Sequence, residues 1–230
     1  NALLTQEPAS AVDMYNVAVG YNAGYAMTTG VQNTLIGALA GDAITIGRFN
    51  TALGYQSLSE NILTDRNTAL GYGTLASLVG DGSTNNQATY NVAIGHNAGN
   101  LMTTGINNTI MGGLAGDALT TGSGSVALGY NALGSTTTAI ENVAIGINAL
   151  VANVDGAKNV AVGSYALTAL DPASATDMYN VAVGHQAGTA ITTGTLNTVI
   201  GGLAGDTLTT GAQNTAIGHE ALSTEDTGAR

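Results

Sequence analysis

Hydrophobic and polar positions alternate in a five-residue pattern that recurs along the whole chain. The pattern is Asn, then Thr or Val, then a small or aliphatic residue, then an aliphatic residue or Met, then Gly, and it occurs twelve times, once with Ser in place of Asn. Nine of the eleven spacings between successive copies are 17 residues, and the other two are 24 and 21. A fixed period of this kind is typical of a repeat architecture.

The alternation within each copy predicts a short strand, since side chains in a strand point to opposite faces in turn. The fourth position is always aliphatic or Met, as in Val19, and we expect it to point inward. The third position is mostly Ala, which suggests close approach of another backbone or chain. A small residue followed by Gly or Leu, as in Ala23 and Gly24, predicts a second short strand. Each 17-residue repeat therefore predicts one coil of a parallel β-solenoid.

Two positions are nearly constant and are interpreted as structural. The first position is Asn at Asn16, Asn33, Asn50, Asn67, Asn91, Asn108, Asn142, Asn159, Asn180, Asn197 and Asn214, with Ser125 as the exception. The fifth position is Gly at Gly20, Gly37, Gly54, Gly71, Gly95, Gly112, Gly129, Gly146, Gly163, Gly184, Gly201 and Gly218. Stacked coils would place the Asn amides about 4.8 Å apart, so they can form a hydrogen-bonded ladder. The Gly would turn the chain where φ is positive.

The spacings predict one all-β array over residues 1–230, with about twelve coils. We expect a partial coil plus an insertion at 1–15, coils one to four at 16–79, an inserted loop at 80–90, coils five to nine at 91–170, an insertion at 171–179 and coils ten to twelve at 180–230. The loop is either a spacer or a receptor-contacting segment. Residues 1–66 align without a gap with 165–230, so we expect the chain to be a fragment of a longer fibre.

Composition narrows the classes of function. Four Lys and Arg against fifteen Asp and Glu give a formal net charge of −11, which disfavours a nucleic-acid partner. There is no Cys, so disulfides and thiolate chemistry are excluded. No apolar run approaches the roughly 18 residues of a membrane span, so we expect no membrane insertion of this segment. A thin coil buries little, yet 44% of residues are apolar, so other copies are expected to cover apolar faces, most simply in a homotrimer.

The repeats NVAVGYNAG at 16–24, NTALGYQSL at 50–58 and NVAIGINAL at 142–150 resemble repeats in the head of trimeric autotransporter adhesins of the YadA type. They are more similar still to the NTAIGYQAL arrays of bacteriophage long tail fibres and bacterial surface proteins. The resemblance covers about residues 12–223 and implies a homotrimer of left-handed parallel β-rolls that serves adhesion outside the cell or on a virion. The period of 17 is longer than that of the adhesin heads, which favours the fibre-array form. Side-by-side rolls and an interwound triple β-helix both remain open.

Few residues are candidates for chemistry. The position after the Gly holds Tyr in several copies and His in three, namely His96, His185 and His219. We interpret these His as surface or interface residues; the alternative is a metal held by three copies of one His around a trimer axis. Three Asp follow a Leu-Ala-Gly sequence, at Asp42, Asp117 and Asp206. We interpret them as turn caps, with a calcium site, which needs about six oxygen ligands, as the weaker alternative.

The sequence predicts a non-enzymatic fibre shaft with no catalytic residue and no cofactor. Such a shaft would space or present a receptor-binding tip at a cell surface or in a virion tail fibre, with the receptor or glycan unidentified. One alternative is an ice- or surface-binding solenoid, suggested by Thr pairs that recur at one position, as in Thr28-Thr29. Another is a glycan-depolymerising tailspike, which would need paired carboxylates in a groove.

Overall fold

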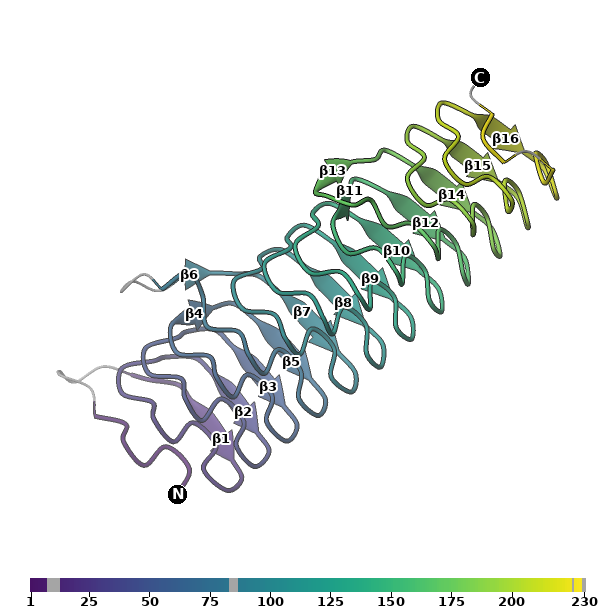
Figure 1. Cartoon of the computed structure of the whole chain (residues 1–230). Coiled ribbons are helices and arrows are strands. Elements are labelled where there is room, and N and C mark those ends of the chain that lie inside the picture. The colour runs from purple at the N-terminus through teal and green to yellow at the C-terminus, as the bar shows by residue number, and fades with distance from the viewer. Residues whose placement is uncertain (8–12, 83–86, 225, 229–230) are drawn as a thin grey trace. The chain divides into compact units, whose positions relative to one another are not determined.

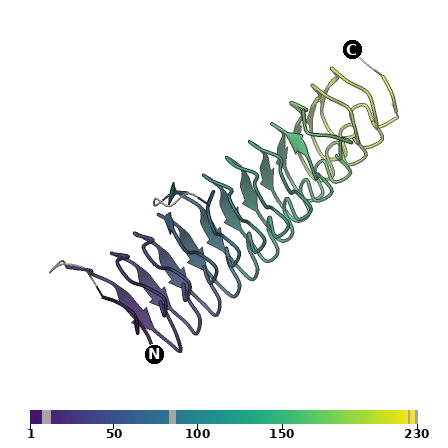
Figure 2. The same cartoon turned by 60° about the vertical axis from the view of Figure 1, so that its left-hand side comes forward.

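A computed structural model describes residues 1–7, 13–82, 87–224 and 226–228, and these contain strands and turns but no helix. The all-β class and the parallel β-solenoid are confirmed. The chain divides into two compact units, Asn1–Leu114 and Ala115–Arg230. Within each unit the strands follow one another like rungs, with turns closing every coil (Figures 1 and 2).

Six three-residue strands form the main sheet of the first unit, and each coincides with one copy of the repeat. They are β1 (Val17–Val19), β2 (Thr34–Ile36), β3 (Thr51–Leu53), β5 (Thr68–Leu70), β7 (Val92–Ile94) and β8 (Thr109–Met111). Neighbouring strands are parallel and pair position by position, for example Ala18 with Leu35. The 24-residue spacing does not disturb this register, since Ala69 of β5 still pairs with Ala93 of β7.

The second unit repeats this arrangement. Its six strands are β9 (Val126–Leu128), β10 (Val143–Ile145), β12 (Val160–Val162), β14 (Val181–Val183), β15 (Thr198–Ile200) and β16 (Thr215–Ile217). Ala144 pairs with Ala127 on one side and with Ala161 on the other. The parallel register brings equivalent residues of successive coils into columns, and these columns position the Asn ladder and the rows of outward side chains described below.

The segment 80–90 was expected to be an inserted loop, but its described part contributes a strand, and so does the insertion at 171–179. In the first unit β6 (Gln87–Ala88) pairs with β4 (Thr64–Asp65), and in the second unit β13 (Thr176–Asp177) pairs with β11 (Gly156–Ala157). Both pairs are parallel. Residues 83–86 of the predicted loop and 8–12 of the N-terminal insertion lie outside the described residues. An insertion thus extends the solenoid locally with a second small sheet.

The expected direction of the strand side chains was wrong. The third position points into the core and is fully buried at Ala52, Ala69 and Ala93, whereas the fourth position points outward, with Leu53 42% exposed. In all twelve copies the fourth position is exposed or half-buried. The interior of a coil is narrow, so it accepts Ala at most copies, and the larger aliphatic residues occupy the outer side of the sheet.

The predicted second strand was also wrong, because the chain after the Gly runs through a series of turns. Non-glycine residues there adopt positive φ, for example Asn22 at 54° and Leu58 at 52°. The motif Gly itself has φ near +135°, and a Cβ on Gly129 would lie 2.7 Å from the carbonyl oxygen of Gly146 in the next coil. Gly is required at this position by both its φ and the close approach of the next coil.

The size of the residue four positions after the motif Gly is matched by the size of the buried side chains around it. Where the fourth residue after the motif Gly is itself Gly, large side chains fill the space: a Cβ on Gly41 would approach Leu35 and Ile44 to 2.9 and 2.7 Å. Where that residue is a buried Leu, as at Leu58, the residue three positions later can be small and polar, as at Asn61. Large side chains thus stand where the neighbouring position is Gly, and smaller ones can stand where it is Leu, as close packing of a protein interior requires.

Candidate functional site

The Asn column forms a hydrogen-bonded ladder along each unit. Where one Asn follows another in the column, its main-chain N–H donates to Oδ1 of the Asn in the preceding coil, at 2.8 Å for Asn33 to Asn16 and 3.0 Å for Asn197 to Asn180. A side-chain link accompanies it, with Nδ2 of Asn197 3.1 Å from the same oxygen. Ser125 keeps the link to the next coil, because its hydroxyl accepts the N–H of Asn142 at 3.2 Å.

The same amides also close their own coils. Nδ2 of Asn33 donates to the carbonyl of Gly47 at 2.9 Å, and Nδ2 of Asn180 donates to the carbonyl of Gly194 at 2.8 Å. Both amides are buried. Each Asn therefore satisfies main-chain groups of two coils at once, and its donors and acceptor are used by the fold itself.

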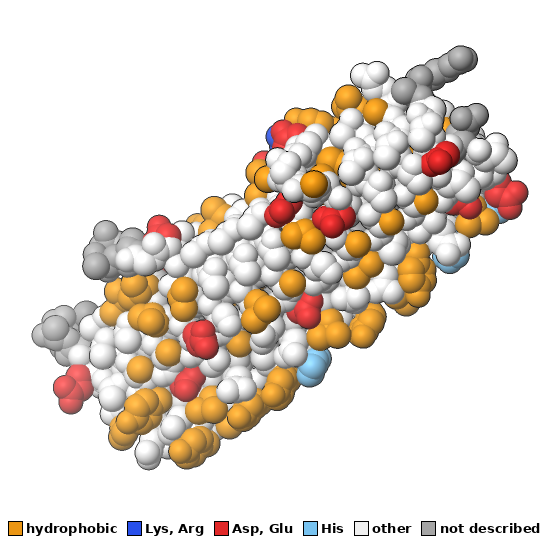
Figure 3. All heavy atoms as spheres, in the orientation of Figure 1, with side chains coloured by type: hydrophobic (Ala, Val, Ile, Leu, Met, Phe, Trp, Pro, Cys, Tyr) orange, Lys and Arg blue, Asp and Glu red, His pale blue; other side chains and the backbone are white. Residues whose placement is uncertain are grey.

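The outward side of the main sheets carries apolar side chains in rows. We call the second, fourth and sixth positions of the repeats the outer face. In the first unit it includes Val19 and Tyr21, which are 58% and 68% exposed, and further exposed large side chains at Val17, Leu53, Tyr55, Leu70, Tyr72 and Met111. In the second unit it includes Tyr130, Ile147, Ile200 and Ile217. Figure 3 shows hydrophobic side chains gathered in rows on the visible surface. These exposed apolar groups recur at equivalent positions of successive coils.

His and Tyr are interchangeable in the sixth position. The rings of Tyr55 and Tyr72 stack at a centroid distance of 5.4 Å, and those of Tyr72 and His96 stack at 5.2 Å. A His ring thus continues an aromatic stack over three successive coils. His185 makes an edge contact with Tyr165 at 6.4 Å, and His219 lies 3.8 Å from Glu220.

The three Asp named as weak metal candidates do not gather into a site. No group of three or more His, Cys, Asp or Glu side chains able to hold a metal ion occurs among the described residues. Burial raises the pKa of Asp42 and that of Asp117 above the ordinary value, against a smaller opposing effect of main-chain hydrogen bonds. One carboxylate oxygen of Asp42 and one of Asp206 are buried without a hydrogen-bond partner. These side chains are thus partly desolvated residues of the turns.

A charged cluster in the first unit was missed by the sequence interpretation. Asp65 is fully buried, and its Oδ1 accepts the main-chain N–H of Arg48 at 2.7 Å. Its Oδ2 accepts Nε of Arg48 at 3.2 Å and lies 3.1 Å from Nη2. The guanidinium of Arg66 is 3.8 Å from Asp65 and stacks between Phe49 and Tyr90, 5.0 and 5.5 Å from their ring centroids. Arg48 and Asp65 are 17 residues apart in the sequence, and this separation of one repeat could have predicted that they lie side by side in neighbouring coils.

A second charged cluster lies at the insertion of the second unit. Nζ of Lys158 is 2.6 Å from Oδ2 of Asp177 and 3.3 Å from the hydroxyl of Tyr179. These hydrogen bonds, first of all the one to Asp177, raise the pKa of Lys158. The hydrogen bond from Lys158 in turn lowers the pKa of Asp177. Within the described part of the chain, Arg48, Arg66 and Lys158 are therefore all paired with Asp.

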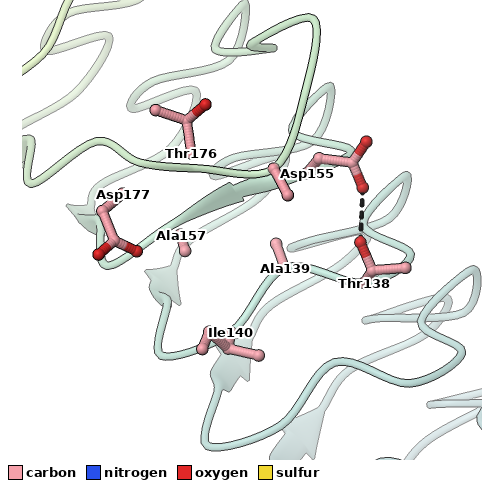
Figure 4. Close-up of a pocket in the computed structure, with 8 residues that line it drawn as sticks. Thr138, Ala139, Ile140, Asp155, Ala157, Thr176 and Asp177 are labelled. Atoms are coloured by element: carbon pink, nitrogen blue, oxygen red, sulfur yellow. Dashed lines mark hydrogen bonds between the residues drawn. The ribbon is translucent and has the colours of Figure 1, made fainter.

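A surface hollow of about 290 Å³ lies beside this cluster (Figure 4). Asp155 and Asp177 both line it, and Asp155 accepts a hydrogen bond from the hydroxyl of Thr138 at 2.6 Å. A glycosidase needs one carboxylic acid with a raised pKa as proton donor. The lowered pKa of Asp177 is the opposite condition, so Asp177 does not meet this requirement.

The Thr pairs that suggested ice binding use hydroxyls within the fold. The first Thr of several pairs donates to a carbonyl of the next coil, from Thr28 to Thr45 at 3.2 Å and from Thr192 to Thr209 at 3.4 Å. The first Thr of these pairs therefore links neighbouring coils by hydrogen bonds.

Within the described residues, no helix is both long enough and apolar enough to cross a membrane. Comparisons of the chain with models of protein families, with curated proteins and with solved structures found no match.

Proposed function

We propose that this chain is a shaft segment of a homotrimeric extracellular fibre, which spaces or presents a receptor-binding tip for attachment to a cell surface. The observation that carries the proposal is the outer face, where the fourth position is aliphatic or Met in every coil and the sixth position is Tyr, His or Ile in eight of the twelve coils. In water such a face is unfavourable, and covering it removes apolar area from solvent.

A second copy of this chain is the partner that fits best. Equivalent residues on the outer face recur at the strand spacing of about 4.8 Å. A partner that contacts many coils must present side chains with the same spacing, and a parallel copy does so in every coil. The outer face carries few charged side chains, and this favours its burial against a partner because the core of an interface is depleted in charged residues.

The remaining features suit a structural role. The polar groups that recur, the Asn ladder and the Thr column, are used in contacts between coils. The resemblance to trimeric β-roll arrays adds the expectation of left-handed coils and of a place on a virion or a cell surface.

The test is the molar mass of the whole chain in solution, measured by light scattering, for the wild type and two variants. Leu53→Lys places a charge on the outer face, and Ile62→Lys places one at an equally exposed residue outside it, since the two side chains are 42% and 43% exposed. We expect a trimer for the wild type and for Ile62→Lys, and dissociation for Leu53→Lys. A folded wild-type monomer would overturn the proposal.

A further inference from the structure

The hollow of the second unit exists only because the repeat is interrupted. The insertion at 171–179 places β13 beside β11, so that Thr176 and Asp177 come to lie near Asp155 and Thr138, which belong to the two preceding coils. A feature that is not repeated in each coil can form a unique site, in contrast to the ladders. Figure 4 shows the Thr138–Asp155 pair toward one end of the hollow and Asp177 toward the other.

The lining combines oxygen groups with a small apolar floor. Two carboxylates and two Thr hydroxyls surround Ala139 and Ala157, both of which are buried. Ionised carboxylates only accept hydrogen bonds, and they form short, strong bonds with hydroxyl donors. The lining therefore favours a ligand with several hydroxyl donors and an apolar face.

Charge and size restrict the ligand further. Lys158 neutralises Asp177 at 2.6 Å, whereas Asp155 is contacted by the neutral Thr138. The hollow thus retains negative charge, which excludes an anionic ligand. Its volume of about 290 Å³ lies just below the roughly 300–1,000 Å³ found for small-molecule pockets, so it suits one ring rather than an extended molecule.

We propose that this hollow binds one neutral saccharide ring, with the hydroxyls of the sugar donating to Asp155 and Asp177 and its C–H face lying on the alanines. Oδ1 of Asp155 already accepts from Thr138 and Oδ2 of Asp177 from Lys158, which orients both carboxylates before a ligand arrives. Preorganised acceptors lose less conformational entropy on binding.

The first unit provides an internal comparison. Its insertion pairs Gln87 and Ala88 with β4 where the second unit pairs Thr176 and Asp177 with β11. Leu63 stands at the repeat position of Asp155. The first unit therefore lacks both carboxylates at the equivalent place, and the proposal assigns binding to the second unit alone.

The experiment is saturation-transfer NMR on the full chain with a panel of neutral methyl glycosides of glucose, galactose, mannose and N-acetylglucosamine. We expect transfer to at least one glycoside, a tenfold or greater weakening in Asp155→Asn, and loss in Ala175→Leu, which fills the hollow. Asp13→Asn is the matched control, because Asp13 accepts from Tyr15 as Asp177 does from Tyr179, away from the hollow. Circular dichroism verifies that each variant is folded.

Two results would overturn the proposal: no transfer to any of the glycosides, or transfer that is unchanged in both hollow variants. The outcome is independent of the fibre proposal, because none of the lining residues belongs to the outer face. If the chain is a trimer that binds no glycoside, only the saccharide proposal fails. If it is a monomer that binds a glycoside, only the homotrimeric fibre proposal fails.

Discussion

The main-chain N–H of Asn50 donates to Oδ1 of Asn33 across 3.0 Å, and this bond links one coil to the next at a buried position. Nδ2 of Asn33 donates at the same time to the carbonyl of Gly47. One side chain therefore satisfies a donor of the following coil and an acceptor of its own. Stability of the array depends on this column because buried main-chain groups without partners are costly.

Replacing Asn33 with Ala removes both contacts. A buried group left without its partner costs about 1–3 kcal/mol, so we expect a loss of about 2–4 kcal/mol in unfolding free energy and faster amide exchange at Asn50. Asn33→Ser is the control, because Ser125 shows that a hydroxyl can accept the N–H of the next coil. Hydrogen exchange and denaturant unfolding measure the difference; equal losses for Ala and Ser would contradict the assigned role.

The motif Gly should tolerate no side chain. Gly129 has φ of +134°, and its Cβ in Gly129→Ala would lie 2.7 Å from the carbonyl of Gly146. We expect a loss of more than about 3 kcal/mol, because strained φ and overpacking add. Gly82 also has positive φ but has no atom within 4 Å of a Cβ, so Gly82→Ala should cost only about 1 kcal/mol. Thermal unfolding of the two variants measures the contrast, and similar melting temperatures would refute it.

The two arginines near Asp65 should contribute unequally. Arg48→Met leaves the buried carboxylate of Asp65 without its closest cation, and breaking such a pair costs up to about 3–5 kcal/mol. Since the Arg48 side chain is partly exposed, we expect about 2–3 kcal/mol. Arg66→Met removes a more distant cation and its contacts with Phe49 and Tyr90, each worth about 0.5–1 kcal/mol. Denaturant midpoints of the two variants give the comparison, and a larger loss for Arg66→Met would reverse the assignment.

Asp42 should weaken the fold at neutral pH. Burial raises the pKa of its carboxyl in the folded state above the value of the unfolded chain. The folded form therefore holds its proton more tightly, and stability falls as pH rises through that raised pKa. Asp42→Asn removes the charge, so we expect a higher melting temperature than the wild type at pH 7 and a difference that shrinks below pH about 4.

Melting curves across this pH range test the expectation. The exposed Asp13 provides the control, because a surface substitution such as Asp13→Asn should change stability by no more than about 0.5 kcal/mol. A stabilisation by Asp42→Asn that is equally large at acid pH would show that the effect is not due to ionisation.

Much of the fold follows from residue spacing alone. The 17-residue period predicts parallel coils, and the constant Asn and Gly mark where each strand begins and where the chain turns away. These predictions succeed because stacking imposes the same constraints on every coil, so the same residue types recur along the twelve copies of the motif. The Arg48–Asp65 contact has the same periodic origin and could have been read from its 17-residue separation.

The tertiary structure decided which face of each strand is inside. In Val17, Ala18 and Val19 both faces are apolar, so the alternation indicates two faces without identifying the inner one. The narrow coil selects the small third residue for its interior and leaves Val19 outside. The paths of the insertions were also decided in three dimensions, since the pairing of Lys158 with Asp177 depends on β13 lying beside β11. Periodicity determines what repeats along a solenoid, whereas packing width and the course of interruptions depend on contacts between coils that no local pattern encodes.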